Sequence, residues 1–146
     1  MNKALYFDMD GTIASLYDVE GWLEDLVNFD PRPYREAPVM LHMATFAKLL
    51  HKAQRNGYHI GIISWLSKSS NPTYDEAVVE TKNLWLKKHL PSVIWDEIVI
   101  VPYGTPKSTV VRFPKGILFD DEQPNRTEWG NAYDPSMIME VLRKLG

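Results

Sequence analysis

The chain has 146 residues, of which 45% are hydrophobic and 24% are charged, and its formal net charge is −3. This composition is that of a globular protein with one core, and the absence of cysteine excludes disulfides and thiolate chemistry. No basic block offers a path for a nucleic-acid backbone, no apolar run is long enough to cross a bilayer, and the first apolar run begins too near Met1 to leave room for a signal peptide. We therefore expect a cytoplasmic protein that binds neither membranes nor nucleic acids.

The chain opens with a short apolar run, Ala4–Phe7, which predicts a buried strand. Asp8 and Asp10 follow it, and residues i and i+2 of an extended chain face the same way. Gly11 then lets the backbone turn out of the sheet. Two such carboxylates repel each other unless a cation or a shared proton intervenes, and Mg²⁺ prefers carboxylates together with phosphate oxygens. An acidic turn is the simpler alternative, whereas a calcium-binding EF-hand loop does not fit, because Val19 stands where its glutamate belongs.

Residues 13–37 are rich in aromatic and acidic residues, and we interpret this stretch, segment 13–37, as a small cap insert over the acidic edge of the sheet. A short helix is expected within residues 18–27, and the prolines of residues 30–33 are expected to end it. The apolar side chains expected on one side of this helix are Trp22, Leu23, Leu26 and Val27.

Strands and helices are expected to alternate in the rest of the chain. Further strands are predicted over residues 58–63, 98–101 and 116–119, and helices over residues 38–56, 74–89 and 135–145. The inner face of the 74–89 helix is expected to consist of Ala77, Val78, Thr81, Leu84 and Trp85. Apolar strands that alternate with helices predict a parallel sheet covered on both faces. We therefore expect an α/β fold in which residues 1–146 form one three-layer Rossmann-like domain.

Each predicted strand ends at a polar residue suited to phosphate chemistry. Asp8 follows the first strand, Ser64 the second, Lys107 the third, and Asp120 with Asp121 the fourth. Because parallel strands end at one edge of a sheet, we expect these side chains to lie close together. Solvated polar loops are the alternative for each, and Ser67, Ser69, Ser70 and Lys115 are competing neighbours of the same types.

In this order the residues resemble the four motifs of the haloacid-dehalogenase (HAD) superfamily, most of whose members are magnesium-dependent phosphohydrolases. Residues 8–12, Asp-Met-Asp-Gly-Thr, are similar to its first motif. The resemblance implies that Asp8 is the nucleophile that becomes an aspartyl-phosphate. It implies that Asp10 protonates the leaving oxygen and then activates water. It also implies that Ser64 binds a phosphoryl oxygen and that Lys107 offsets the charge of the phosphate and of Asp8.

The resemblance further implies a Mg²⁺ cofactor held by the side chains of Asp8, Asp120 and Asp121 and by the main-chain carbonyl of Asp10. Which member of the adjacent pair touches the metal directly stays open. Pro124 and Asn125 stand where some family members carry a more distant acid, so the adjacent pair must serve here.

The substrate is expected to be a small phosphomonoester. Trp65 follows Ser64 directly and Trp22 lies in segment 13–37, so both rings could stack on a base, or could pack within the segment. The pattern is similar to 5′-nucleotidases and deoxyribonucleotidases of the superfamily, which implies a nucleoside monophosphate as substrate. A phosphosugar phosphatase, a nucleic-acid-end phosphatase and a non-catalytic binding domain are the alternatives. A short insert leaves the pocket open unless a partner subunit of a homo-oligomer covers it.

Overall fold

The computed structural model describes residues 3–145, which contain five strands and six α-helices. The strands are β1 (Ala4–Phe7), β2 (His59–Trp65), β3 (Glu97–Val101), β4 (Ile117–Phe119) and β5 (Ala132–Tyr133). The α-helices are α1 (Trp22–Val27), α2 (Arg32–Glu36), α3 (Met43–Arg55), α4 (Pro72–His89), α5 (Gln123–Trp129) and α6 (Ile138–Lys144). Short 3-10 helices are η1 (Leu16–Asp18), η2 (Lys107–Thr109) and η3 (Pro135–Met137).

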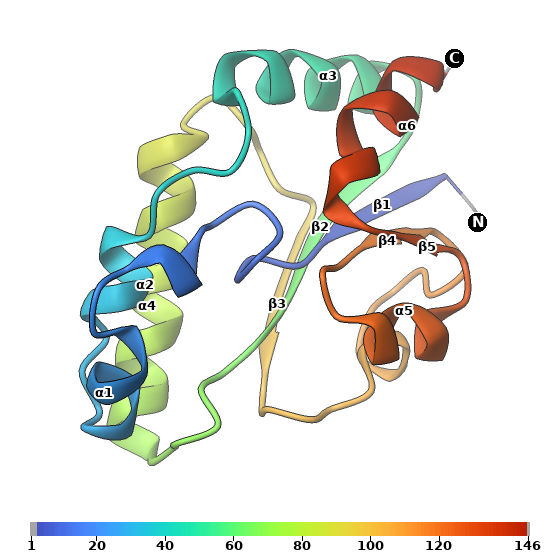
Figure 1. Cartoon of the computed structure of the whole chain (residues 1–146). Coiled ribbons are helices and arrows are strands. Elements are labelled where there is room, and N and C mark those ends of the chain that lie inside the picture. Colours follow the sequence, from blue (N-terminus) through green and yellow to red (C-terminus); the bar gives the residue numbers. More distant parts are fainter. Residues whose placement is uncertain (1–2, 146) are drawn as a thin grey trace.

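The five strands form one parallel sheet in the order β3-β2-β1-β4-β5. At the end of β1, Phe7 pairs with Ile62 of β2 and with Phe119 of β4. Helices α3 and α6 lie side by side on one face of the sheet, and α5 lies on the other (Figure 1). The predicted α/β class and parallel sheet are confirmed, and the central strand delivers Asp8 to the edge where its neighbours also end.

Alternating side chains of β1 supply both faces of the sheet. Leu5 and Phe7 join the larger core with α3, α4 and α6, whereas Ala4 and Tyr6 pack on the opposite face with Trp129 of α5. This period of two, apolar on both sides, is what a strand covered by helices on both faces requires.

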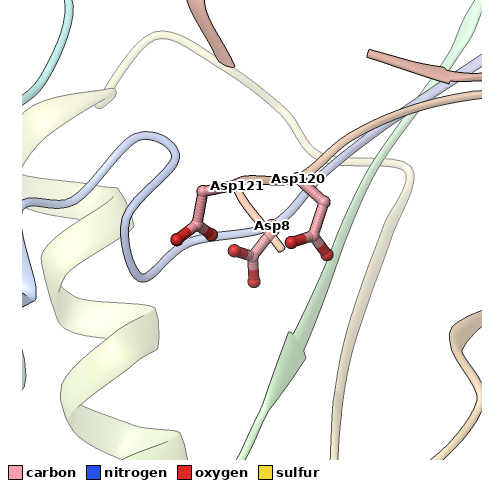
Figure 2. Close-up of side chains that lie close together, drawn as sticks. All are labelled: Asp8, Asp120 and Asp121. Carbon is pink, nitrogen blue, oxygen red and sulfur yellow. The ribbon is translucent and has the colours of Figure 1, made fainter. Parts of the chain in front are cut away.

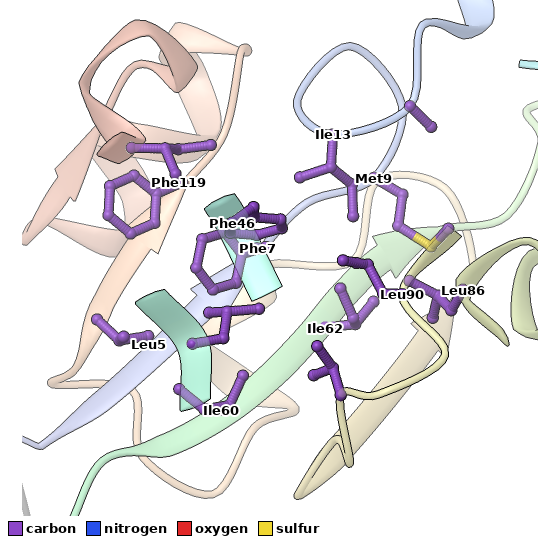
Figure 3. Packing of buried hydrophobic residues seen from close by; sticks show 14 of the residues in the cluster. Leu5, Phe7, Met9, Ile13, Phe46, Ile60, Ile62, Leu86, Leu90 and Phe119 are labelled. Atoms are coloured by element: carbon purple, nitrogen blue, oxygen red, sulfur yellow. The ribbon is translucent and has the colours of Figure 1, made fainter. Parts of the chain in front are cut away.

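Aromatic rings pack around the end of β1, directly before Asp8. Phe7 stacks on Phe119 with ring centroids 5.0 Å apart and meets Phe46 of α3 edge to face at 5.2 Å. Met9 and Ile13 extend the same cluster into the turn after β1, as Figure 3 shows. The acidic side chains that follow β1 and β4 therefore lie next to a close-packed part of the core.

Three helical elements differ from the expectation. The helix predicted over residues 38–56 begins later, at Met43, because the stretch before it runs along segment 13–37, where the Pro38 carbonyl accepts a hydrogen bond from the Ser15 amide (2.7 Å). The prolines of residues 30–33 do not only end α1. They also stand at the start of α2, where the missing N–H of proline costs no hydrogen bond. Helix α5 and strand β5 were not predicted at all.

The predicted inner face of α4 is wrong at one position. Leu84 is 56% exposed, whereas Lys82, which was not assigned to the inner face, is only 1% exposed. The buried side chains of this helix recur three or four residues apart, and a lysine takes one place in that stripe. Among the helices of residues 3–145, none combines the length and the apolar character needed to cross a membrane.

The helices of segment 13–37 pack against α4, while Ile13 and Ala37 at the ends of the segment join the core on the sheet. Helices α1 and α2 lie beside α4 in Figure 1, and Leu16, Leu26 and Tyr34 form a small core with Tyr74 and Val78 of α4. Outside this core, the Arg32 guanidinium binds the Asp25 carboxylate and so joins the two short helices. Segment 13–37 therefore has its own packing next to the carboxyl edge of the sheet.

Candidate active site

The carboxyl edge of the sheet brings together three acidic side chains from two strands. Asp8 leaves β1, Asp120 and Asp121 leave β4, and one oxygen of each carboxylate lies within 4.8 Å of the others. The three carboxylates point toward one another in Figure 2. Asp8 is 6% exposed and Asp120 is fully buried, so their negative charges are poorly solvated.

The turn after β1 closes over this cluster. Gly11 has a φ of +82°, and a Cβ there would lie 2.3 Å from Oδ2 of Asp121. The hydroxyl of Thr12 donates to Asp8 Oδ2 (3.1 Å) and accepts a hydrogen bond from the Asp121 amide (3.2 Å). The small Gly11 therefore allows the turn after β1 to approach Asp121. The Thr12 hydroxyl links Asp8, at the end of β1, to Asp121, which follows β4.

Lys107 supplies a positive charge from the loop after β3. Its Nζ lies 3.0 Å from Asp8 Oδ1 and 2.6 Å from Asp120 Oδ2, and the residue is 2% exposed. Burial alone would lower the pKa of Lys107, but the two carboxylates outweigh burial and raise it. Lys107 is therefore a cation at the site.

Asp10 has a separate cationic partner, which comes from α4. Lys82 Nζ donates to Asp10 Oδ2 at 3.0 Å and to two acceptors at the end of β2, Ser64 Oγ and the Trp65 carbonyl, each at 2.7 Å. Burial raises the pKa of Asp10, with the charge of Asp8 acting in the same direction and that of Lys82 opposing it. The two carboxylates of the first motif are thus bound by different lysines.

The remaining acids have perturbed pKa values with a shared cause. Burial, followed by the charge of Asp8, raises the pKa of Asp120 to about 6 and that of Asp121 to about 8. Poor solvation and the negative charges nearby thus favour the protonated form of each of these two carboxyl groups.

The charges at the edge fit a divalent cation. When all four carboxylates are deprotonated, two buried ammonium groups balance only two of the four negative charges: Asp8, Asp10, Asp120 and Asp121 against Lys82 and Lys107. Clustered carboxylate oxygens are the ligands that Mg²⁺ prefers, and a divalent cation would offset both the burial of these charges and their mutual repulsion. The residues present could therefore hold Mg²⁺.

The two serines near the end of β2 differ in what their hydroxyls contact. Ser64 is fully buried, and its hydroxyl oxygen accepts a hydrogen bond from Lys82. Ser67 is 4% exposed and lines the cavity described next, and within residues 3–145 its Oγ has no hydrogen-bond partner. Ser64 remains a predicted phosphate ligand, because within the described residues its O–H is free to donate, and Ser67 is a second candidate that lies at the cavity wall.

A cavity of about 330 Å³ opens over Asp8, Asp10 and Asp121. Its wall is largely apolar and is built from segment 13–37 on one side and from the loops after β2 and β3 on the other. The apolar and aromatic residues that line it are Leu16, Tyr17, Trp22, Leu23, Leu26, Val27, Tyr34, Trp65, Leu66 and Tyr103. Such a wall would suit a ligand that carries an apolar or flat group beyond its charged end.

Two aromatic pairs contribute to this wall. Tyr17 and Trp22 meet edge to face with centroids 4.9 Å apart, and Trp65 lies 4.9 Å from Tyr103. The indole N–H of Trp65 donates to the Thr105 carbonyl (2.8 Å), and the ring lies 5.3 Å from Lys107 Nζ. Both predicted tryptophans line the cavity, but Trp65 also packs against the cation of the site.

Sequence reasoning missed three residues that contact the acids. Thr12 stands in the first motif but has no role implied by the resemblance, Lys82 is not among the residues expected to matter in the 74–89 helix, and Asn125 stands only where some family members carry an acid. The Asn125 amide donates to Asp120 Oδ2 at 3.2 Å. A signal existed for Lys82, because it follows Val78 by four residues and precedes Leu86 by four, within an apolar stripe.

Comparisons with known proteins bear on the fold. No protein family matches the chain, and no curated protein matches its sequence. Solved structures do match, among them the D,D-heptose 1,7-bisphosphate phosphatase from Burkholderia thailandensis. That structure aligns with a TM-score of 0.52 at 15% identity, over 88% of this chain and 72% of its own. The similarity shows that the chain has the Rossmann-like, HAD-like fold that the four motifs predicted.

Proposed function

We propose that the protein is a magnesium-dependent phosphatase that hydrolyses a small phosphomonoester through an aspartyl-phosphate on Asp8. One observation carries the proposal. The Asp8 carboxylate lines an open cavity while Lys107 holds it at 3.0 Å beside two further acids. A nucleophilic carboxylate needs a route for substrate and a nearby cation, and this one has both.

The proposed reaction has two steps that use the same pair of acids. An oxygen of Asp8 attacks phosphorus, the ester P–O bond breaks, and Asp10 gives its proton to the leaving oxygen. Asp10 then takes a proton from water as the water attacks phosphorus, which releases phosphate and restores the Asp8 carboxylate. Lys107 stays protonated and offsets the charge that builds on the phosphoryl oxygens.

Asp8, Asp120 and Asp121, with the Asp10 carbonyl, are the groups proposed to hold Mg²⁺. The bound ion would supply positive charge that lets a dianionic phosphate approach several carboxylates. The phosphoryl oxygens are proposed to accept hydrogen bonds from Lys107 and from a serine hydroxyl, for which Ser64 and Ser67 are the two candidates.

Segment 13–37 is proposed to act as a cap that selects the group attached to the phosphate. The proposed substrate is a nucleoside or deoxynucleoside monophosphate, because aromatic and aliphatic side chains dominate the cavity wall. A phosphosugar is the second candidate, since the similar structure is named as a heptose bisphosphate phosphatase. A sugar would place polar hydroxyls against that apolar wall, and we therefore rank it below the nucleotide.

The test is a screen for phosphate release. Purified protein with Mg²⁺ is given nucleoside monophosphates, phosphosugars and an aryl phosphate, each with and without excess chelator. We expect release from at least one nucleotide, abolished by the chelator and by Asp8→Asn. A folded, magnesium-loaded protein that hydrolyses none of these compounds would leave a non-catalytic binding domain as the better account.

A further inference from the structure

Lys82 stands out among the buried groups because the proposed reaction does not use it. The side chain comes from the middle of α4, is 1% exposed, and lies where the helix otherwise buries apolar residues. Burying an ammonium group is costly unless every N–H finds an acceptor. A methionine at this position would continue the stripe without that cost.

The contacts of Lys82 satisfy all three of its N–H bonds. Nζ donates to Asp10 Oδ2 at 3.0 Å, to Ser64 Oγ at 2.7 Å and to the Trp65 carbonyl at 2.7 Å. Nζ also lies 4.8 Å from the centroid of the Tyr34 ring, within the range of a cation–π contact. The cation is therefore held from β2 and from segment 13–37, which leaves it little freedom to move.

The Lys82 ammonium donates a hydrogen bond to one of the two carboxylate oxygens of Asp10, Oδ2. The other oxygen, Oδ1, accepts no side-chain or amide hydrogen bond within residues 3–145, and Asp10 lines the cavity beside Asp8. A carboxyl group that exchanges a proton with substrate needs one oxygen free and the plane of the group fixed.

We propose that Lys82 is a positioning residue that holds Asp10 in the orientation needed to transfer a proton to the leaving oxygen. The inference rests on the proposed phosphatase function and adds a residue to it. The step is the first of the two described above. As the P–O bond breaks, its electron pair goes to the leaving oxygen, and the proton of the Asp10 carboxyl follows.

Leaving-group chemistry separates this role from a structural one. An alkoxide, such as the 5′-oxygen of a nucleoside, is a poor leaving group and needs the proton, whereas 2,4-dinitrophenolate leaves readily without it. Loss of the lysine should therefore reduce kcat/KM for alkyl phosphates and spare the dinitrophenyl ester. General damage to the fold or to Asp8 would reduce both alike.

The main experiment compares Lys82→Met with wild type on a nucleoside monophosphate and on 2,4-dinitrophenyl phosphate, both with Mg²⁺. Lys87→Met, an exposed lysine of the same helix, is the matched control. We expect the variant to lose about 100-fold or more on the nucleotide and less than about tenfold on the dinitrophenyl ester, in line with the usual size of general-acid catalysis. Equal losses on both substrates would overturn the inference.

A second comparison covers the case in which Lys82→Met does not fold, because that variant leaves the Asp10 charge without its partner. The double variant Asp10→Asn/Lys82→Met removes both charges of the pair, whereas Asp10→Asn leaves the Lys82 ammonium with neutral acceptors only, among them Ser64 Oγ and the Trp65 carbonyl. If Lys82 acts through Asp10, the two should hydrolyse 2,4-dinitrophenyl phosphate at the same rate, within about twofold. A further drop in the double variant would show that the lysine acts on something else.

These outcomes are distinct from a failure of the proposed function. A wild-type protein without magnesium-dependent phosphatase activity, or one whose activity survives Asp8→Asn, would remove the reaction itself. An active wild type whose Lys82 variants lose activity uniformly would leave the reaction standing and remove only the positioning role.

Discussion

Gly11 shows how tightly single residues determine the geometry of the acids. The residue combines a φ of +82° with a Cβ position that lies 2.3 Å from Asp121 Oδ2. An alanine there would strain the backbone and also push against a proposed metal ligand. The glycine of the first motif is therefore needed for close approach as well as for the turn.

We predict that Gly11→Ala costs more stability than Gly57→Ala and also weakens magnesium binding. Gly57 is the matched control, because it has a similar φ of +89° but nothing within 4 Å of an added Cβ. Backbone strain alone costs about 1–3 kcal/mol, so that much is expected from Gly57→Ala. Urea unfolding gives the two free energies, and magnesium-induced shifts in melting temperature report the site. Equal effects of both substitutions would contradict the contact with Asp121.

The polar residues at the strand ends could be predicted from the sequence, whereas the side chains that bind them, such as Lys82, could not. The acids and Lys107 follow apolar runs, and a parallel sheet must bring such residues to one edge. Lys82 lies in helix α4, 18 residues after Ser64, at a position where the helical period predicts an apolar side chain. Its contact with Asp10 spans 72 positions in sequence, and no local pattern encodes that distance.

Segment 13–37 is the element on which substrate choice is proposed to depend. Leu23 and Val27 are 59% and 55% exposed, yet both line the cavity on the side that Trp22 also borders. Apolar side chains left open in this way, next to buried acids, are typical of a binding surface for the non-phosphate part of a substrate.

We predict that Trp22→Ala lowers kcat/KM for a nucleoside monophosphate by about tenfold to a hundredfold, because stacking on a base is worth about 1–3 kcal/mol. An aryl or small alkyl phosphate should be affected less. Trp22 is a better probe than Trp65, whose ring also lies 5.3 Å from Lys107 Nζ and whose loss would disturb the cation. Steady-state kinetics on both substrates measures the difference.

Arg32→Ala is the control for this comparison. It removes the ion pair with Asp25 that joins α1 to α2 but takes no ring from the cavity wall. If Arg32→Ala produces the same substrate-dependent loss, the effect of Trp22→Ala comes from disturbing the structure of segment 13–37 and not from losing the Trp22 ring. Equal losses on both substrates in Trp22→Ala would move the proposed substrate toward a phosphosugar.

Elements with strong apolar periodicity were predicted, and elements fixed by tertiary contacts were not. The four strands predicted from apolar runs correspond to β1, β2, β3 and β4, and each predicted end lies within two residues of the observed one. Strand β5 has only two residues and exists because it pairs with β4, so its sequence alone carries no strand signal. Helix α2 has five residues and depends on packing against α4.

On the scale of the whole molecule, the excess of carboxylates makes stability depend on pH. The pKa values of Asp120 and Asp121 are raised to about 6 and about 8 by burial and by Asp8, whereas in the unfolded chain both groups release their protons near pH 4. Between these values the native state binds more protons than the unfolded state. The contribution of the pair to stability therefore falls as pH rises from about 4 to about 8.

We predict that the metal-free protein loses stability over this range and that Mg²⁺ restores it. The magnesium-induced rise in melting temperature should be larger at pH 8 than at pH 5.5, because the ligands must be deprotonated to bind the ion. The double variant Asp120→Asn/Asp121→Asn should show a flatter pH dependence and little response to Mg²⁺. A metal-free wild type whose stability increases from pH 5 to pH 8 would contradict the charge account.

The proposed aspartyl-phosphate on Asp8 can be tested directly by trapping it. Wild-type protein is mixed with its best substrate and Mg²⁺, quenched in acid within one turnover, and reduced with borohydride, which converts an acyl phosphate to an alcohol. Mass spectrometry of the peptide that contains residues 4–12 should then show homoserine at residue 8 and unmodified aspartate at residue 10. Homoserine at another acid, or turnover in Asp8→Asn comparable to wild type, would contradict the assignment of Asp8 as the nucleophile.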